Sequence, residues 1–433
     1  MNKLFSFLFS AMERVKKLLP AKSSTPNETL LKLLSSELKL SLYVSGGCSS
    51  ILGWLTLFPG SSKVVAETRN PYARSAIINT LGYEPSTYVG SEVSRDFALK
   101  AFTNTQRYLY SDSEDDLHFR QERILGVGIT GALKSNYMRK GKHHAFVSLV
   151  DQKKYITYYI LLDKDQRTRE EEDYFIGYNV LNIINNPLTE NPVLIGNVLA
   201  NDQITVVETK PTIDLLLSQL SSSIMNIVFL PGGKILVDQI VKKCVILPGS
   251  FNPVHEGHVT LGEVAARKCG VDKSNVIFEL SALNADKGLI AKEEIEKRVE
   301  MIVDRGFGAM ITHKPFFYAK NDYLKEGFFV VGADTYKRIV NTKYYNNSRD
   351  IMISKLSEFE KNKNTLVVAP RLNSETNKVE TLKDFEIPDV LKPFVSELEH
   401  FRRDVSSTEI RKKLQEKERN ENNNFYHFSE QKC

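Results

Sequence analysis

Two histidines, three residues apart, stand in the segment with the clearest chemical pattern of the chain. His255 and His258 lie in the sequence G-S-F-N-P-V-H-E-G-H at 249–258, between the apolar run 244–247 and a helical pattern over 257–269. Residues at this spacing share one face of a helix start, so both imidazoles can donate hydrogen bonds to one ligand. Free N–H groups and the helix dipole at a strand–turn–helix junction attract anions. The pattern predicts a phosphate site; the alternative is a pair of surface histidines.

A second candidate site lies about 150 residues further on, in V-S-S-T-E-I-R. Ser406 and Glu409 form a capping-box pattern at the start of a predicted helix. Ser407 and Thr408 leave hydroxyl and N–H groups facing outward, and Arg411 follows one turn later. An arginine at this place can bind polyphosphate through bidentate contacts. Taken alone, the segment is better interpreted as a helix cap.

Together, the two segments resemble the nucleotidylyltransferase superfamily, which is marked by HxGH after the first strand and an ISSTxxR-like sequence near the end. The resemblance covers about residues 243–416. Within the superfamily, this block is most similar to nicotinamide-mononucleotide adenylyltransferase. That similarity rests on G-S-F-N-P at 249–253, K-G-L-I at 287–290 and G-A-D at 332–334.

The resemblance implies a reaction in which an acceptor phosphate attacks the α-phosphorus of ATP and pyrophosphate leaves, with Mg²⁺ as the ATP counter-ion. It implies that His255 and His258 stabilise the transition state and that Lys287 and Arg411 neutralise the triphosphate. Asp334 would contact ribose or a metal-bound water, and no residue is predicted to bind a metal directly. The implied nucleotide-binding residues are Gly249, Ser250, Phe251, Gly257, Gly332, Asp334, Ser406, Ser407 and Thr408.

The acceptor is less clearly indicated than the reaction. The resembling family stacks nicotinamide on tryptophans, but the only tryptophan here is Trp54, in the other half of the chain. Other rings can stack instead, although core or surface packing is at least as typical of them. These candidates are Phe316, Phe317, Tyr318, Tyr336, Tyr344 and Tyr345.

Residues 28–185 resemble the C-terminal domain of the competence-damage-inducible CinA family, which can hydrolyse the amide of nicotinamide mononucleotide. The resemblance implies that Ser62, in the P-G-S-S turn, is the nucleophile and that Tyr72 lies near it. The family's lysine should fall near Ile77, but no lysine stands there. Its ESCTGG turn is altered to S-G-G-C-S-S at 45–50.

Ser62 therefore lacks the base that a serine needs to attack an amide. Arg74 stays protonated, and Lys63 is more typical of a solvated loop lysine. A pairing of Ser62 with Cys48 is a further alternative. We expect this domain to bind a nucleotide or to support assembly rather than to hydrolyse, and the resemblance also implies self-association.

Apolar periodicity predicts the elements that carry these residues. Gly126 and Gly128, in the run 124–129, indicate a central strand where backbones approach closely. In the first block we expect helices over 28–40, 51–58, 91–110 and 174–184, with strands over 42–44, 124–129, 146–150 and 155–162. In the second block we expect strands over 244–247, 276–280, 328–331 and 366–369, with helices over 257–269, 293–304 and 407–415.

Strands that alternate with helices predict an α/β fold with a parallel sheet in the second block. The predicted order is a CinA-like α/β domain followed by a Rossmann-like nucleotidylyltransferase domain. We expect an N-terminal tail at 1–26, the first domain at 27–186, a connecting region at 187–241, the second domain at 242–416 and a disordered tail at 417–433.

Composition narrows the class of protein. A net charge of +5 over 433 residues does not predict nucleic-acid binding. Four cysteines without metal-ligand spacing indicate free thiols in a reducing compartment, so we expect a cytoplasmic protein. No apolar run long enough for a membrane span is present, so stable membrane insertion is not expected. Residues 1–26 fit a targeting segment or a peripheral helix, and the choice stays open.

The leading hypothesis is ATP-dependent adenylyl transfer to a phosphorylated small molecule, with nicotinamide mononucleotide giving NAD. Both resemblances point to that nucleotide, which is an argument by analogy. The alternatives are a nucleotide-sensing or scaffold protein without turnover, and an amidohydrolase acting through Ser62.

Overall fold

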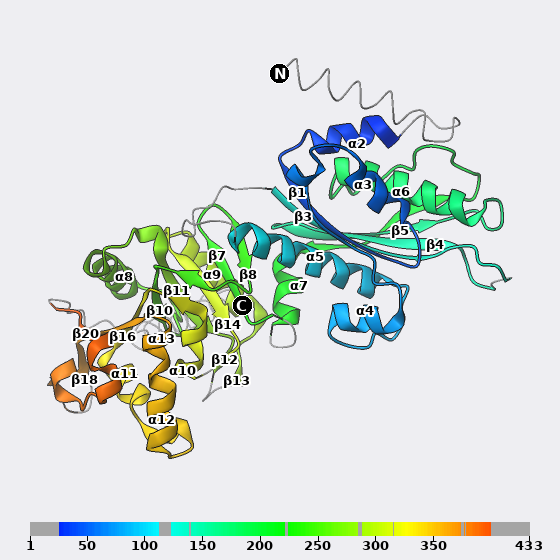
Figure 1. The fold of residues 1–433 in the computed structure, drawn as a ribbon. Coiled ribbons are helices and arrows are strands. Elements are labelled where there is room, and N and C mark those ends of the chain that lie inside the picture. Colours follow the sequence, from blue (N-terminus) through cyan, green and yellow to red (C-terminus); the bar gives the residue numbers. More distant parts are fainter. Residues whose placement is uncertain are drawn as a thin grey trace, which may run out of the picture. The chain divides into compact units, whose positions relative to one another are not determined.

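A computed structural model describes residues 26–111, 123–137, 140–220, 224–284, 288–314, 316–373, 376 and 378–399. The chain divides into two compact units: the first reaches Gln219 and the second begins at Leu220 (Figure 1). Each unit combines a sheet with packed helices, which confirms the predicted α/β class. The two predicted tails, except Pro26, and the helix predicted over 407–415 lie outside the described residues. Within the described part of the chain, no helix has the length and apolar character to cross a membrane.

The first unit is built on a six-stranded mixed sheet with the order β2-β1-β3-β4-β5-β6. Strand β1 runs parallel to β2 and β3, and the remaining pairs are antiparallel. The strands are β1 (Leu38–Ser45), β2 (Val65–Arg69), β3 (Arg123–Ala132), β4 (His144–Val150), β5 (Lys154–Leu161) and β6 (Gln203–Pro211). The helices are α2 (Pro26–Leu34), α3 (Ser50–Leu57), α4 (Arg74–Leu81), α5 (Ser91–Ser111), α6 (Arg169–Asn185) and α7 (Thr212–Gln219).

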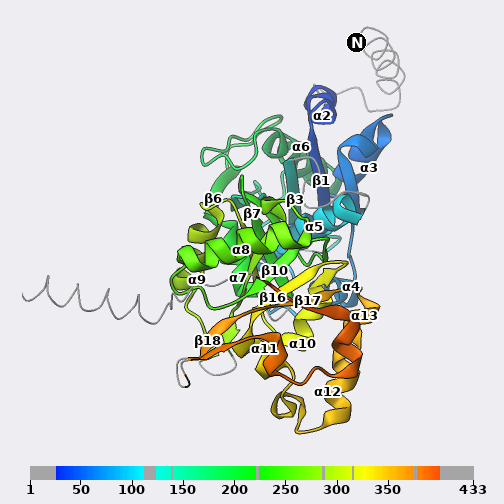
Figure 2. The ribbon, with the colours of Figure 1, turned by 90° about the vertical axis from the view of Figure 1, so that its left-hand side faces the viewer.

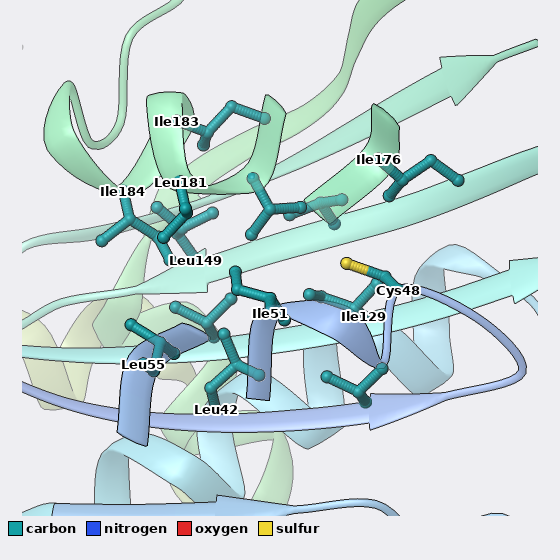
Figure 3. Close-up of a cluster of buried hydrophobic side chains, with 14 of the residues drawn as sticks. Leu42, Cys48, Ile51, Leu55, Ile129, Leu149, Ile176, Leu181, Ile183 and Ile184 are labelled. Carbon is teal, nitrogen blue, oxygen red and sulfur yellow. The ribbon is translucent and has the colours of Figure 1, made fainter. Parts of the chain in front are cut away.

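Helices cover both faces of this sheet. Figure 1 shows α2, α3 and α6 on one face and α5 on the other. The larger core lies between the sheet and the helices α3 and α6, where Leu42, Ile129 and Leu149 meet Ile51 and Ile176 (Figure 3). Burial of these apolar side chains is the main force that holds the layers together.

The predicted close approach at Gly126 and Gly128 is confirmed. A Cβ on Gly126 would lie 2.1 Å from the carbonyl oxygen of Ala98, and one on Gly128 would lie 1.9 Å from that of Ser94. Both oxygens belong to the backbone of α5. The two glycines thus let the helix backbone lie directly on β3, and no other residue type fits there.

The second unit carries an eight-stranded sheet with the order β20-β17-β16-β10-β11-β14-β7-β8. The six strands from β20 to β14 are parallel, and β7 and β8 form an antiparallel hairpin at one edge. Numbered along the chain from β10, the parallel strands follow the order 3-2-1-4-5-6 of a doubly wound dinucleotide-binding sheet. This arrangement confirms the predicted Rossmann-like architecture.

The sheet strands of this unit are β7 (Asn226–Leu230), β8 (Lys234–Val237), β10 (Val245–Pro248), β11 (Val276–Ser281), β14 (Gly308–Thr312), β16 (Phe328–Gly332), β17 (Thr365–Ala369) and β20 (Val395–Glu397). Shorter strands are β9 (Val241–Lys242), β12 (Leu283–Asn284), β13 (Gly288–Leu289), β15 (Leu324–Lys325), β18 (Arg371–Asn373) and β19 (Lys378–Glu380). The helices are α8 (Glu256–Cys269), α9 (Lys292–Val303), α10 (Phe317–Lys320), α11 (Ala333–Ile339), α12 (Arg349–Leu356) and α13 (Glu358–Lys361).

Two segments differ from the sequence-based expectation. The segment 187–241, predicted as a connecting region, supplies β6 and α7 to the first unit and β7 and β8 to the second. The helix predicted over 28–40 ends at Leu34, and β1 begins at Leu38. The hydroxyls of Ser35 and Ser36 donate hydrogen bonds to carbonyls of the last helical turn. Such bonds satisfy acceptors at the helix end and favour its termination.

Candidate active site

Two of the predicted site segments meet at the carboxyl edge of the second sheet. The histidine loop follows β10, the Gly332–Asp334 segment follows β16, and β17 lies next to β16 (Figure 2). Between β10 and β16 the strand order reverses, because later strands add on the other side of the first one. Doubly wound sheets bind nucleotides in the crevice at this switch point. Strand order alone therefore places His255 and Asp334 on either side of one crevice.

The two histidines form a stacked pair at the start of α8. Their ring centroids are 3.7 Å apart with 19° between the planes. The backbone N–H of His255 donates to Nδ1 of His258 at 3.4 Å. Because Nδ1 of His258 accepts, its proton is assigned to Nε2, which is left free to donate to a ligand. Nδ1 of His255 is buried and has no partner among the described residues.

Both imidazoles are held in the neutral form. Burial, then His255, then Arg371 lower the pKa of His258 from 6.5 to about 3. Burial and Arg371 also lower the pKa of His255, while Glu256 acts in the opposite direction. Desolvation disfavours the cation, and the neighbouring positive charge adds to it. At neutral pH the pair therefore offers hydrogen-bond donors, and an anion bound here would raise both pKa values.

The turn before the histidines is anchored from three directions. The N–H of Gly249 donates to the carbonyl of Glu279 on β11 at 3.0 Å. Phe251 adopts φ +46°, and its buried ring contacts the edges of His258 and Phe278. Arg298 of α9, which is 6% exposed, donates to the Ser250 carbonyl at 3.0 Å. These contacts hold the turn in one conformation. Gly257 is buried in the first turn of α8.

Arg298 is a site-supporting residue that sequence reasoning missed. Its guanidinium also contacts Glu294, four residues earlier on the same helix, at 2.8 Å. In sequence that spacing is typical of an exposed helix pair. The contact to Ser250 depends on how α9 packs, so the sequence carries no signal for it.

Arg371 is a second missed residue, and it lies within the site itself. Its Nη1 donates to both carboxylate oxygens of Asp334, at 3.1 and 3.2 Å. A Cβ on Gly332 would lie 2.7 Å from Asp334 Oδ1 and 3.6 Å from Arg371 Cδ. Gly332 therefore makes room for this pair. A basic residue directly after the end of a parallel strand is the signal that could have indicated it.

Five predicted site residues cannot be placed. Lys287, Ser406, Ser407, Thr408 and Arg411 lie outside the described residues. Their roles stay predictions. Among the residues that the structure does describe, no group of three or more His, Cys, Asp or Glu side chains gathers as a metal site.

The aromatic side chains predicted to stack on a substrate ring differ in how deeply they are buried. Phe317 packs on the core rings of Phe329 and Phe359, and Tyr336 is fully buried. Phe316 is 38% exposed and lies parallel to Tyr318, with 5.6 Å between ring centroids. This pair follows β14, whose carboxyl end shares the edge that carries the histidines. Phe316 and Tyr318 thus stay partly exposed after a strand that ends at this edge.

The candidate residues of the first unit do not form a catalytic group. Ser62 is exposed, and no described residue is hydrogen-bonded to its hydroxyl. Cys48 is fully buried in the apolar core (Figure 3), and burial raises the pKa of its thiol well above the ordinary value. A thiol of this kind is inert. The alternative pairing of Ser62 with Cys48 is therefore wrong.

The altered turn at 45–50 is closed by side chains from α6. The backbone N–H groups of Ser49 and Ser50 donate to Asp173 at 2.8 and 2.9 Å. Arg169 donates to the Gly46 carbonyl at 3.0 Å and to the Tyr72 hydroxyl at 3.3 Å. A carboxylate already occupies the start of α3, where a phosphate would bind. The nucleotide-binding role predicted for this domain gains no support here.

The second unit has the strand order of a doubly wound α/β fold, with the candidate site at its switch point. Residues 246–413 match the cytidylyltransferase-like family, which supports a nucleotidylyltransferase-superfamily domain in this part of the chain and nucleotidyl transfer as its general activity. Among solved structures, the chain is similar to the competence/damage inducible protein CihA from Agrobacterium tumefaciens. They are 20% identical over 37% of this chain and 90% of that one, with a TM-score of 0.27. No curated protein matches the sequence.

Proposed function

We propose that the second unit transfers the adenylyl group of ATP to nicotinamide mononucleotide, giving NAD and pyrophosphate. The observation that carries this proposal is the pair of neutral, stacked histidines at the switch point of the sheet. The cytidylyltransferase-like match supports nucleotidyl transfer in general. That ATP is the nucleotide and that nicotinamide mononucleotide is the acceptor are our proposals beyond that match.

In the proposed reaction, an oxygen of the acceptor phosphate bonds to the α-phosphorus of ATP. The bond from that phosphorus to the bridging β-phosphate oxygen breaks, and pyrophosphate leaves with the electron pair. No bond to the protein forms, so catalysis consists of positioning and charge stabilisation. Nε2–H of His258 donates to the reacting phosphate, and the guanidinium of Arg371 adds positive charge at the same edge.

Other groups would complete the site. Lys287 and Arg411 are proposed to neutralise the triphosphate, and the hydroxyls at 406–408 to bind the nucleotide. Mg²⁺, which supplies charge neutralisation when bound, is usually held by substrate phosphates with one or two carboxylates. Asp334 is a described carboxylate at this edge and fits that role.

The aromatic pair supports an acceptor with a flat ring. Phe316 and Tyr318 present parallel, partly exposed rings after β14. Aromatic side chains stack on planar heterocycles through dispersion and quadrupole interactions. They are proposed to replace the tryptophans with which the resembling family holds nicotinamide.

We also infer that the first unit does not hydrolyse an amide. Ser62 is exposed, and no described side chain is placed as its base. The altered turn at 45–50 is closed by Asp173, which accepts from the N–H groups of Ser49 and Ser50. Ammonia release from nicotinamide mononucleotide that disappears in Ser62→Ala would contradict this inference.

The proposal is tested with purified protein, Mg²⁺-ATP and a panel of phosphorylated acceptors, with pyrophosphate release as the readout. We expect release with nicotinamide mononucleotide and loss of release in His258→Ala. Absence of release with every acceptor would contradict the transferase assignment and favour a nucleotide-binding protein without turnover. Unchanged release in His258→Ala would contradict the role of the histidines.

A further inference from the structure

We propose that Asp334 and Arg371 form a built-in exchange pair: the carboxylate holds the guanidinium in the empty site and yields it to the polyphosphate when the nucleotide binds. This inference rests on the proposed function. It adds Arg371 as a residue that binds the polyphosphate and Asp334 as a carboxylate that competes with the polyphosphate for Arg371. Sequence motifs pointed to Asp334 but not to its partner.

The sheet brings the pair to the phosphate site. Strands β10, β16 and β17 are consecutive neighbours and parallel, so the segments that follow them meet at one edge. His255 follows the first of these strands, Asp334 the second and Arg371 the third. The positive charge of Arg371 also acts on both histidines, which agrees with that placement.

The geometry of the pair favours exchange over a permanent structural role. A single guanidinium nitrogen, Nη1, contacts both oxygens of Asp334 at 3.1 and 3.2 Å, rather than two nitrogens forming a fork. The side chains of Arg371 and Asp334 are 57% and 48% exposed. Ion pairs with this exposure are weak because water competes for both groups. A polyphosphate offers more charge and a bidentate geometry to arginine.

The competition has a specific consequence. Removing the carboxylate frees the guanidinium, so Asp334→Asn should bind inorganic pyrophosphate more tightly than the natural protein. Removing the guanidinium in Arg371→Gln should weaken binding. Because Asp334 acts through Arg371 in this scheme, Asp334→Asn should have little effect once Arg371 is already replaced.

The experiment is calorimetric titration of the full chain with inorganic pyrophosphate, without Mg²⁺ and at fixed low salt. We expect about 10-fold weaker binding in Arg371→Gln, since hydrogen bonds between charged groups are strong. We expect several-fold tighter binding in Asp334→Asn and a near-zero effect of Asp334→Asn in the Arg371→Gln background. The matched controls are Arg349→Gln and Glu386→Gln, which break an exposed ion pair of 3.2 Å in the same unit and should leave binding unchanged.

Several outcomes would overturn the exchange. One is pyrophosphate binding that is unchanged or weaker in Asp334→Asn. Another is that Asp334→Asn tightens pyrophosphate binding equally in the natural protein and in Arg371→Gln, which would mean that Asp334 only repels the anion. Absence of pyrophosphate binding to the natural protein would overturn it as well. The titration needs no turnover, so an intact exchange without adenylyl transfer refutes the proposed function alone.

Discussion

His258 should stay neutral far below the pH at which an ordinary histidine is protonated. Its pKa is lowered from 6.5 to about 3, first by burial and then by His255 and Arg371. At pH 5, a group with a pKa of about 3 is protonated in about 1% of molecules, whereas an ordinary histidine is protonated in about 97%. This difference is large enough to be measured residue by residue.

The assay is an NMR titration of histidine-labelled protein, with the His258 signal assigned by its loss in His258→Asn. We expect the Nε2–H tautomer throughout, because Nδ1 accepts from the His255 backbone. We also expect no titration midpoint between pH 5 and 8, and an upward shift of the pKa when pyrophosphate is added. A midpoint near 6.5 in the free protein would refute the described packing of the pair.

The same depressed pKa makes stability depend on pH. Between about pH 6.5 and pH 3, the unfolded chain takes up a proton at His258 that the folded chain does not. Protonation therefore favours the unfolded state as the pH falls, by about 1.4 kcal/mol per pH unit for one such group. His258→Asn removes this contribution, so the pH dependence of unfolding of the second unit should be flatter in the variant.

Three further predictions follow from packing. Gly128→Ala forces a Cβ to 1.9 Å from a backbone oxygen and should lower the free energy of unfolding by about 3 kcal/mol or more. The control Gly53→Ala meets nothing within 4 Å and should be neutral or stabilising. Thermal unfolding of both variants is followed by the fluorescence of the single tryptophan, which lies in the first unit. Lys320→Met leaves the buried Glu279 carboxylate without its cation, although the Thr312 hydroxyl still donates to it, and should cost about 3–5 kcal/mol by calorimetry. Adding Glu279→Gln should recover most of this loss. Cys48 should resist iodoacetamide in the folded protein and react in urea, as read by mass spectrometry.

Much of the fold was predictable because its signals are local. The apolar run 244–247 and the helical pattern after it correspond to β10 and α8, and the loop between them carries both histidines. Gly126 and Gly128 indicated a close backbone approach, which the packing of α5 on β3 explains. In each case the sequence signal is carried by residues that are close together in the chain.

The features that sequence reasoning missed depend on packing between distant segments. Arg371 and Arg298 reach the site only because β17 lies beside β16 and α9 packs under the turn. The hairpin of β7 and β8 gains its place only by pairing with β14. The leucines over 28–40 are compatible with a helix or a strand. The hydrogen bonds of the Ser35 and Ser36 hydroxyls favour the end of α2 at this point.

The central claim, adenylyl transfer by the second unit, is tested most directly with ATP labelled at the α-phosphate. The labelled ATP is incubated with the full chain, Mg²⁺ and nicotinamide mononucleotide, and the products are separated. We predict that the label appears in NAD, with one pyrophosphate released per labelled dinucleotide. Label that stays in ATP, or appears only in AMP or ADP, would contradict the claim.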